Sequence, residues 1–285
     1  MRDPDPRVVL GLHRSRHERR ILIGALDLGV TALDTSANYL GFRSPEVLAR
    51  VAGDLLPKFT LSTKVGYFPG TDRAEHSLDP VQLHAAVEQT ARDLGREPDL
   101  VFLHNPEHSL AGTTVQSREV LSEACAALDA ATAKGLCGAW GIATWDPTSL
   151  PPLIDASVPT PSVLMVRAGL LVGARTLDAA EALIGAWGLG AGRVWGMSPF
   201  SGSARAPVWY RVDPRIFLRD GSGYSRAQAA FRVAYRLPNV GAVAVGTDKP
   251  AHLGELVGAL AAEPDERAVG EYRTLLRGRM RAQSL

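Results

Sequence analysis

Four side chains in the first 104 residues form a set that can transfer a proton to a carbonyl oxygen: Asp34, Tyr39, Lys64 and His104. A carbonyl that accepts a hydride becomes an alkoxide, and a tyrosine hydroxyl can protonate it as it forms. A close ammonium stabilises the remaining phenolate and lowers the tyrosine pKa from about 10. A carboxylate can pair that ammonium in the interior, and an imidazole can direct the reacting oxygen.

Each of these residues also has an ordinary structural explanation. Asp34 could cap the following turn, Tyr39 could pack a loop, and His104 could be a hydrogen-bonded structural histidine. Lys64 is harder to explain, because it lies in an apolar segment and a buried ammonium needs a partner. The chain has four lysines among its 31 basic residues, so arginine would be expected wherever any cation served. Together the four residues favour a catalytic set.

Eight short and nearly continuous apolar runs are predicted as parallel strands that are buried on both faces. They span residues 7–12, 31–34, 60–65, 100–104, 139–142, 163–166, 193–197 and 241–245. Helical patterns separate these runs. The clearest helix begins at Asp79 and Pro80, an N-cap followed by proline at the first helical position, and ends at Gly95.

Further helices are expected over residues 18–28, 121–131 and 264–285, and after the pairs Asp146-Pro147 and Lys249-Pro250. Eight strands alternating with eight helices predict a (β/α)8 TIM barrel, with residues 1–285 as a single domain that includes a C-terminal helix and tail. A doubly wound open sheet is the rival fold. It is disfavoured because the first strand runs into GLHRSR rather than a G-x-G-x-x-G turn.

A barrel brings the carboxyl ends of all its strands to one mouth. Asp34, Lys64 and His104 lie at or near the ends of three successive strands, and Tyr39 lies in the loop that leaves the first of them. The other strand ends carry Thr144, Arg167, Ser198 and Thr247. Residues 198–225 form the longest irregular stretch, and a loop of that length in a compact domain is usually functional.

Composition excludes several classes of function. A net charge of +1 offers no concentrated basic face for nucleic acid or an anionic membrane. No apolar run reaches the roughly 18 residues of a spanning helix, and the N-terminus is charged and broken by proline, unlike a signal peptide. Cys125 and Cys137 are expected to be reduced packing residues. These features predict a cytoplasmic monomer or small homo-oligomer without a metal site.

The sequence around the four residues resembles the aldo-keto reductase family. Residues 29–39, GVTALDTSANY, are similar to the family's G-(I/V)-x-x-(F/L)-D-T-A-x-x-Y, and STKVG at 62–66 contains its T-K motif. DLVFLHNP at 99–106 matches its D-L-x-x-x-H segment, and SPF at 198–200 and VGT at 245–247 resemble two later motifs. The resemblance covers nearly the whole chain. It implies that Asp34, Tyr39, Lys64 and His104 are the catalytic tetrad and that the cofactor is NAD or NADP.

The contacts that the resemblance implies for the cofactor are altered in this chain. The family's Ser-Asn is Ala143-Thr144, its stacking tyrosine is Met197, and the arginine that grips a 2′-phosphate is Asp248. An acidic residue there repels a 2′-phosphate and favours NAD, although the adjacent Lys249 could offset it. The strand around 162–171 instead resembles the sugar (aldose/galactose) dehydrogenase-like subgroup. The residues expected to bind the cofactor are Thr144, Arg167, Ser198, Gly246, Thr247, Asp248 and Lys249.

Three functions follow from this combination. The leading one is a nicotinamide-dependent oxidoreductase that interconverts a small polar carbonyl and its alcohol, with Tyr39 as general acid–base. A non-redox enzyme (dehydration, isomerisation or cyclisation) that keeps the tetrad with weak or absent dinucleotide binding is the alternative. A binding or regulatory protein, similar to the potassium-channel beta subunits, is disfavoured by the intact tetrad.

Aromatic residues near the expected mouth are the candidate substrate contacts. They are Tyr67, Phe68, Trp145, Trp209 and Tyr210, with Arg43 or Arg167 for an anion or hydroxyl. Such rings pack against sugar faces and against flat rings, so the sequence does not choose between these substrates. Trp209 and Tyr210 serve equally well to pack the long loop around them.

Overall fold

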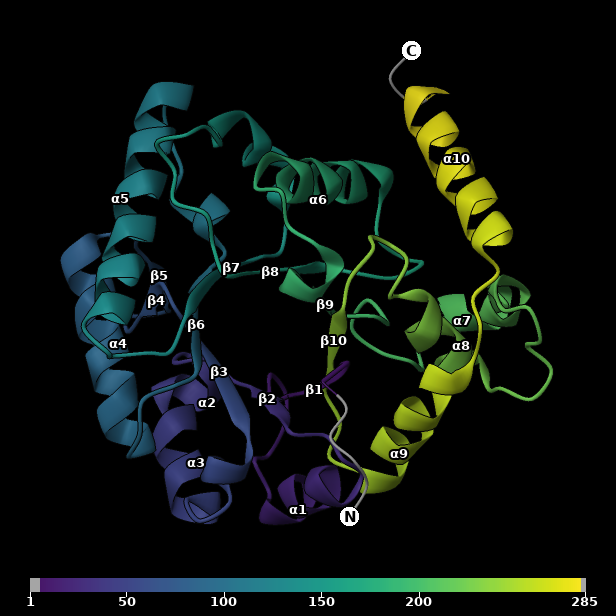
Figure 1. Cartoon of the computed structure of the whole chain (residues 1–285), viewed down its shortest axis with the longest axis horizontal. Helices are drawn as coiled ribbons and strands as arrows, with labels where there is room; N and C mark the ends of the chain where they lie inside the picture. The colour runs from purple at the N-terminus through teal and green to yellow at the C-terminus, as the bar shows by residue number, and fades with distance from the viewer. Residues whose placement is uncertain (1–5, 283–285) are drawn as a thin grey trace.

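Eight parallel strands close into a barrel in the computed structural model, which describes residues 6–282 (Figure 1). The strands are β1 (Val8–Gly11), β2 (Ala32–Asp34), β3 (Thr60–Val65), β6 (Leu100–His104), β7 (Trp140–Thr144), β8 (Val163–Arg167), β9 (Val194–Met197) and β10 (Ala242–Val245). They follow one another in sequence order, and β10 pairs with β1 to complete the ring. The predicted (β/α)8 fold is confirmed, and each strand ends within two residues of its predicted bounds.

Helices surround the barrel. They are α1 (Arg19–Asp27), α3 (Ser44–Ala52), α4 (Pro80–Leu94), α5 (Thr114–Ala133), α6 (Ala174–Ala186), α8 (Arg226–Val233), α9 (Pro250–Gly258) and α10 (Glu266–Ala282). The sequence signals of α4 act as predicted. Asp79 accepts a hydrogen bond from the Gln82 amide at 2.8 Å, and Gly95 ends the helix in a left-handed conformation, with φ of 69°.

The segment after β7 corrects one prediction. Asp146-Pro147 was expected to begin a helix, but the chain forms two 3₁₀ turns, η3 (Pro147–Ser149) and η4 (Pro151–Leu153). Two further prolines, at 151 and 152, explain the difference, because each lacks an amide hydrogen and its ring clashes with the preceding helical turn. Asp146 still caps the first turn by accepting from the Thr148 amide.

Smaller elements lie in the connections between these strands and helices. They are the antiparallel pair β4 (Tyr67–Phe68) and β5 (Glu75–His76), the short helices α2 (Tyr39–Phe42) and α7 (Val208–Arg211), and the 3₁₀ turns η1 (Leu56–Lys58), η2 (Pro106–His108), η5 (Ala191–Arg193), η6 (Pro214–Phe217) and η7 (Ala259–Ala261). The stretch 198–225 therefore contains α7 and η6. Trp209 and Phe217 from this stretch are buried in an apolar cluster with α8 and α10.

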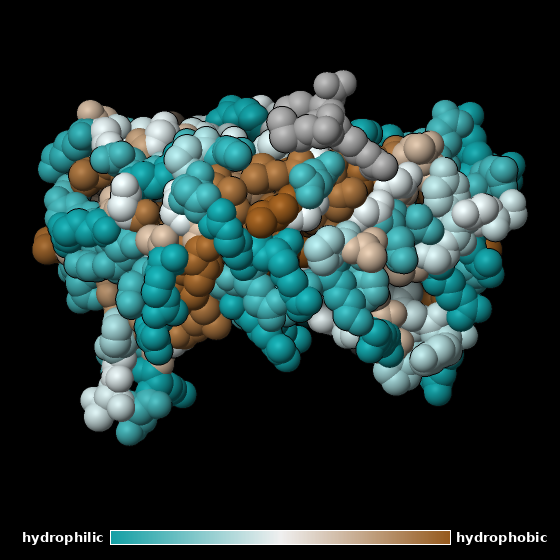
Figure 2. Space-filling model, turned by 90° about the horizontal axis from the view of Figure 1, so that it is seen from below, coloured by the Kyte–Doolittle hydropathy of each residue, from teal (hydrophilic) through white to brown (hydrophobic). Residues whose placement is uncertain are grey.

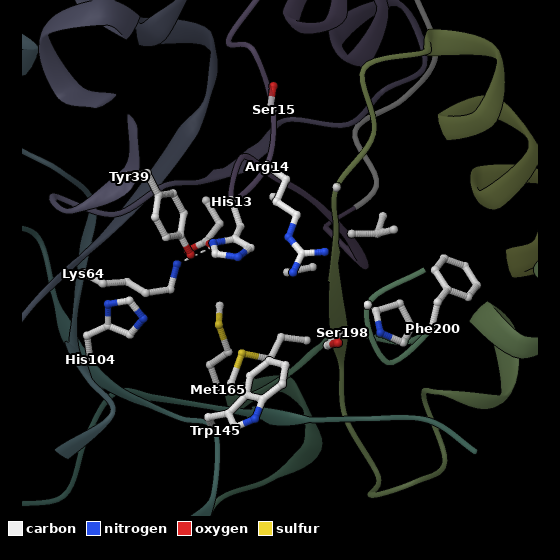
Figure 3. Close-up of a pocket in the computed structure, with 18 of the residues that line it drawn as sticks. His13, Arg14, Ser15, Tyr39, Lys64, His104, Trp145, Met165, Ser198 and Phe200 are labelled. Atoms are coloured by element: carbon white, nitrogen blue, oxygen red, sulfur yellow. Dashed lines mark hydrogen bonds and ion pairs between the residues drawn. The ribbon is translucent and has the colours of Figure 1, made fainter. Parts of the chain in front are cut away.

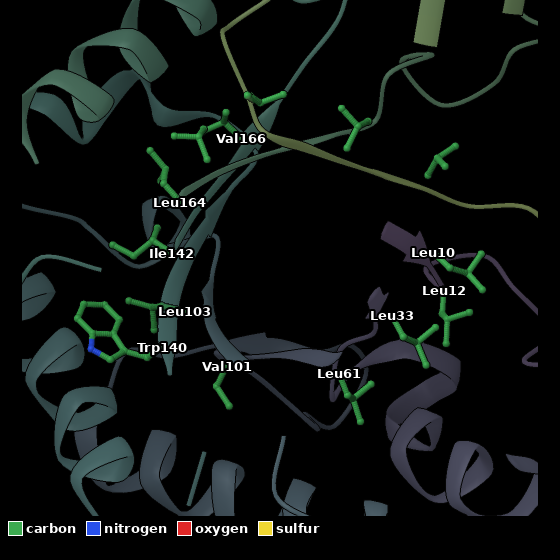
Figure 4. Close-up of a cluster of buried hydrophobic side chains, with 14 of the residues drawn as sticks. Leu10, Leu12, Leu33, Leu61, Val101, Leu103, Trp140, Ile142, Leu164 and Val166 are labelled. Atoms are coloured by element: carbon green, nitrogen blue, oxygen red, sulfur yellow. The ribbon is translucent and has the colours of Figure 1, made fainter. Parts of the chain in front are cut away.

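Strand alternation decides which side chains face the barrel interior. Phe102 packs inside with Val9 and Met165, whereas Val101 and Leu103 pack outward toward the helices (Figure 4). Lys64 lies opposite Phe102 in the β3–β6 register, so it also points inward. The ordinary alternation of side chains along β3 thus places the Lys64 ammonium inside the barrel.

The outer surface seen in Figure 2 is mostly hydrophilic, with apolar residues showing in small groups between polar ones. Within residues 6–282, no helix is long and apolar enough to cross a membrane.

Candidate active site

A cavity of about 570 Å³ opens at the carboxyl ends of the barrel strands (Figure 3). The ends of β1, β2, β3 and β6 form one side, and the ends of β8, β9 and β10 with their following loops form the other. Tyr39, Lys64 and His104 lie close together on the first side, across the cavity from Ser198 and Phe200.

A buried ion pair forms the base of the first side. Lys64 is 2% exposed, and its Nζ donates to Asp34 Oδ2 at 2.5 Å and to the Thr35 carbonyl at 2.8 Å. The other Asp34 oxygen accepts from Ser62 Oγ at 2.8 Å. Burial by itself would lower the Lys64 pKa, but the charge of Asp34 and the neighbouring Tyr39 raise it above its usual value. Lys64 is therefore a fully partnered ammonium at neutral pH.

Tyr39 lies beside this ion pair and near two imidazoles. Lys64 Nζ lies 5.3 Å from the centre of the Tyr39 ring. The ring centres of His13 and His104 lie 4.9 Å and 6.4 Å from that of Tyr39, both edge-on. Burial raises the pKa of Tyr39 above its ordinary value, although Lys64 acts against this rise. The ammonium lowers the pKa as the sequence predicts, but removing water from the phenolate has the larger effect, so the net direction is upward.

The backbone turns sharply directly after Tyr39. Leu40, Gly41 and Phe42 have φ values of 51°, 61° and 67°, all in the left-handed region. Leu40 and Phe42 carry a side-chain clash there that glycine avoids. Strained backbone of this kind persists where the surrounding structure fixes it, often at functional sites.

His104 presents a neutral imidazole to the cavity. Its Nδ1 lies 3.2 Å from Ser36 Oγ, which leaves Nε2 for a ligand, and its carbonyl accepts from His76 Nε2 at 2.7 Å. Burial, followed by the positive charge of Lys64, lowers the His104 pKa well below its ordinary value of 6.5. A neutral ring hydrogen-bonds a substrate oxygen and leaves proton donation to another group.

The cavity brings together part of the set selected from the sequence. Ten of those residues line it, namely Asp34, Tyr39, Lys64, Tyr67, His104, Trp145, Ser198, Gly246, Thr247 and Asp248. Seven do not, namely Arg43, Phe68, Thr144, Arg167, Lys249, Trp209 and Tyr210. Thr144 and Trp209 are buried in packing, whereas Tyr210 is 77% exposed. The Arg167 guanidinium carbon lies 4.7 Å from the centre of the Trp145 ring. Arg167 therefore contacts a cavity residue without lining the cavity itself.

The loop after β1 supplies cavity residues that the sequence reasoning missed. His13, Arg14 and Ser15 line the cavity, and Figure 3 shows the Arg14 guanidinium reaching into it. Arg14 forms no ion pair with any described side chain. The signal was available, because residues 11–16 directly follow the first strand and therefore lie at the mouth.

Asp248 ties the last loop of the barrel to this first loop. Its Oδ1 accepts from Ser15 Oγ at 2.8 Å and from the Arg16 amide at 3.3 Å. Lys249 directly precedes α9, is exposed, and does not line the cavity. The carboxylate, rather than the neighbouring ammonium, therefore faces the cavity at this end.

A closed parallel barrel with a polar cluster at the carboxyl ends of its strands defines the architecture of a (β/α)8-barrel enzyme. Residues 14–187, more than half of the chain, match the sequence pattern of the Aldo/keto reductase family. The chain belongs to that family. No curated protein matches the sequence.

Solved structures share the fold at low sequence identity. An aldo-keto reductase from Bacillus halodurans in its holo form has a TM-score of 0.71 and 19% identity, over 95% of this chain and 91% of that one. An aldo-keto reductase from Klebsiella pneumoniae in complex with NADPH has a TM-score of 0.69 and 17% identity, over 95% and 91%. Aldose reductase from Giardia lamblia has a TM-score of 0.68 and 16% identity, over 98% and 94%.

Proposed function

We propose that this chain uses a nicotinamide dinucleotide to interconvert a small carbonyl compound and its alcohol, with Tyr39 as the general acid–base. Family membership supports an oxidoreductase of the aldo-keto reductase type. The observation that carries the proposal is the buried Lys64–Asp34 pair beside Tyr39. A buried ion pair adds little to stability compared with apolar packing, so its position beside a cavity tyrosine is better explained by chemistry.

The cavity suits a dinucleotide in extent and in charge. Its lining runs from Lys64 and Tyr39 to Thr247 and Asp248 at the beginning of the α9 loop. Arg14 brings an unpaired guanidinium into this space, and a guanidinium is well suited to grip a diphosphate. The sulfur atoms of Met165 and Met197 offer polarisable contacts to a flat ring.

When bound, the reduced nicotinamide supplies the hydride. The chain's own residues then handle the oxygen and its proton. In the tautomer that carries its proton on Nε2, His104 donates a hydrogen bond to the carbonyl oxygen and orients it, and the Tyr39 hydroxyl donates its proton to that oxygen as negative charge develops. The raised pKa of Tyr39 keeps this hydroxyl protonated through neutral pH. Lys64 stabilises the phenolate that remains, and Asp34 fixes the position of Lys64.

A preference for NADH over NADPH is part of the proposal. Its support is the Asp248 carboxylate at the α9 end of the cavity, where a 2′-phosphate would meet a like charge. Lys249, which could have offset that charge, is exposed outside the cavity lining.

Two measurements on wild type and Tyr39→Phe test the proposed function. The first is calorimetric titration with NADH and with NADPH, and the second is the rate of reduction of a panel of aldehydes. We expect wild type to bind NADH and reduce at least one aldehyde. Tyr39→Phe should bind NADH as wild type does but lose at least about a hundredfold in turnover, the usual contribution of a general acid. Near wild-type turnover by Tyr39→Phe would remove this residue from the mechanism.

A second candidate function is favoured by Thr144. Its side chain is fully buried and does not line the cavity, which argues against the cofactor contact expected from the sequence. A non-redox enzyme would use Tyr39, Lys64 and His104 for proton transfer alone. Failure of both dinucleotides to bind at millimolar concentration would favour this alternative.

A further inference from the structure

The wall of the cavity formed by β6, β7 and the β4 hairpin is aromatic. Tyr67 and Trp145 line it beside His104, and the Tyr67 and His104 ring centres are 4.9 Å apart. Met165 adds a sulfur at the inner end. Trp145 lines the cavity and is 44% exposed, so part of its indole is open to a ligand there.

The polar groups of this wall already bind one another. The Tyr67 hydroxyl lies 2.6 Å from His108 Nδ1 and accepts from Asn105 Nδ2 at 3.2 Å. The Asn105 side-chain Oδ1 accepts from the Trp145 backbone amide at 3.1 Å. A ligand with many hydroxyl groups would find few unused donors and acceptors here, and it would lose hydration without replacing it. The wall therefore presents ring faces and edges rather than hydrogen-bonding groups.

A half-buried carboxylate fixes the position of Trp145. Glu107 Oε1 accepts from the Trp145 amide and from the Asp146 amide, both at 2.8 Å. Together with Asn105 it holds the first residues after β7, at the point where no α-helix follows to support them. The proposed mechanism has no use for this carboxylate, and burial raises its pKa despite these amide contacts.

A guanidinium supports the indole as well. The Arg167 guanidinium carbon lies 4.7 Å from the Trp145 ring centre, a cation–π arrangement. Arg167 is half-buried and does not line the cavity. The ring is thus held through its backbone by Glu107 and through its π-system by Arg167, while part of its surface remains in the cavity.

We propose that Trp145 is a platform for a flat apolar group, so that the substrate is an aryl-substituted carbonyl compound rather than a sugar. Glu107 is a positioning residue that acts through Trp145. This inference rests on the proposed function, which assigns the carbonyl of the substrate to Tyr39 and His104. The inference itself concerns the group attached to that carbonyl. It replaces the polar substrate that the sequence favoured, because the polar groups of this wall that would bind its hydroxyl groups are already paired.

Steady-state reduction of benzaldehyde and of D-glyceraldehyde tests the platform. For Trp145→Ala we expect the benzaldehyde KM to rise about tenfold, as loss of a stacked ring pair and its buried area implies, with kcat within about twofold. The D-glyceraldehyde KM should stay within about twofold. Trp145→Phe, which keeps a ring, should retain most of the affinity for benzaldehyde. A D-glyceraldehyde KM that rises as much as the benzaldehyde KM would overturn the proposal in favour of a sugar-binding wall.

Glu107 variants test the positioning role. Glu107→Gln keeps an oxygen that can accept from both amides and should behave as wild type, whereas Glu107→Ala should raise the benzaldehyde KM selectively, as Trp145→Ala does. An equal fall in kcat for both aldehydes in Glu107→Ala would show a general structural role and contradict the assignment.

Titration with benzyl alcohol separates this inference from the proposed function. We expect calorimetric binding of benzyl alcohol to wild type that weakens about tenfold in Trp145→Ala, whether or not any carbonyl is turned over. Such binding without turnover would reject the proposed function and keep the platform. Turnover of benzaldehyde that is indifferent to Trp145→Ala would reject the platform and keep the proposed function.

Discussion

Removing the Lys64 ammonium should affect stability and activity together, because one side chain serves both. Lys64→Met leaves the Asp34 carboxylate 5% exposed, with Ser62 Oγ as its remaining side-chain partner. The Thr35 carbonyl loses the same donor. Breaking a buried pair by removing one partner costs about 3–5 kcal/mol, because the other charge stays in the interior.

This loss of free energy of unfolding predicts a decrease in the melting temperature. At about 2.1 cal/mol/K per residue, a chain of 285 residues has an unfolding entropy of roughly 0.6 kcal/mol/K. A loss of about 4 kcal/mol therefore lowers the melting temperature by roughly 7 °C. Carbonyl reduction should fall at the same time, because the phenolate of Tyr39 loses its stabilising charge.

Scanning calorimetry and kcat/KM for NADH-dependent reduction measure both effects. Lys58→Met is the matched control, because Lys58 is exposed and should change neither quantity. Lys64→Met combined with Asp34→Asn should recover much of the stability without activity, since it removes the uncompensated charge. Lys64→Arg should not restore activity. The larger, planar guanidinium group of arginine cannot occupy the site of the Lys64 ammonium, which is 2% exposed. A melting temperature for Lys64→Met equal to that of the control would refute the reasoning.

Three further predictions concern the cofactor end of the cavity and the buried histidines. Asp248→Arg should tighten NADPH binding at least about tenfold relative to NADH in calorimetric titrations, since a charge-assisted hydrogen bond is worth about 1.5–3 kcal/mol; an unchanged ratio of the two Kd values counts against the NADH preference. Arg14→Ala should weaken NADH and NADPH about equally, by tenfold or so, if its guanidinium grips the shared diphosphate, and a selective loss of one dinucleotide would contradict this. Burial lowers the pKa values of His17 and His104 below 6.5, so the unfolded chain binds protons there that the folded chain does not. The free energy of unfolding in urea should therefore fall as pH drops below about 6.5, by up to about 1.4 kcal/mol per pH unit for each histidine, and a flat profile between about pH 7.5 and 5.5 would contradict it.

Local sequence signals were sufficient where one property dominates. The strands were predictable because a parallel strand buried on both faces must be apolar throughout, and α4 was predictable because its cap, proline and terminal glycine act within one turn each. The helix expected after Asp146-Pro147 was wrong because the start signal was real but Pro151 and Pro152 prevent the helix from continuing.

Some residues of the candidate site could likewise be predicted from local sequence signals, and others could not. Asp34, Tyr39, Lys64 and His104 could be selected from the sequence because their residue types, their strand positions and one buried lysine agree on a single chemistry. Glu107 and the contacts of Asp248 could not, because their positions depend on loops that meet only when the barrel closes. Closure sets Ser15 against Asp248 across 233 positions of the chain.

The sequence by itself determined the barrel and the side chains that can move a proton, because strand burial and the cost of an unpaired ammonium are local properties of residue type. The tertiary structure decided which pKa shifts prevail at Tyr39, which charge faces the α9 end of the cavity, and which polar groups of the wall are already satisfied. Those outcomes depend on burial and on hydrogen-bond partners from distant segments, and neither quantity exists until the chain has folded.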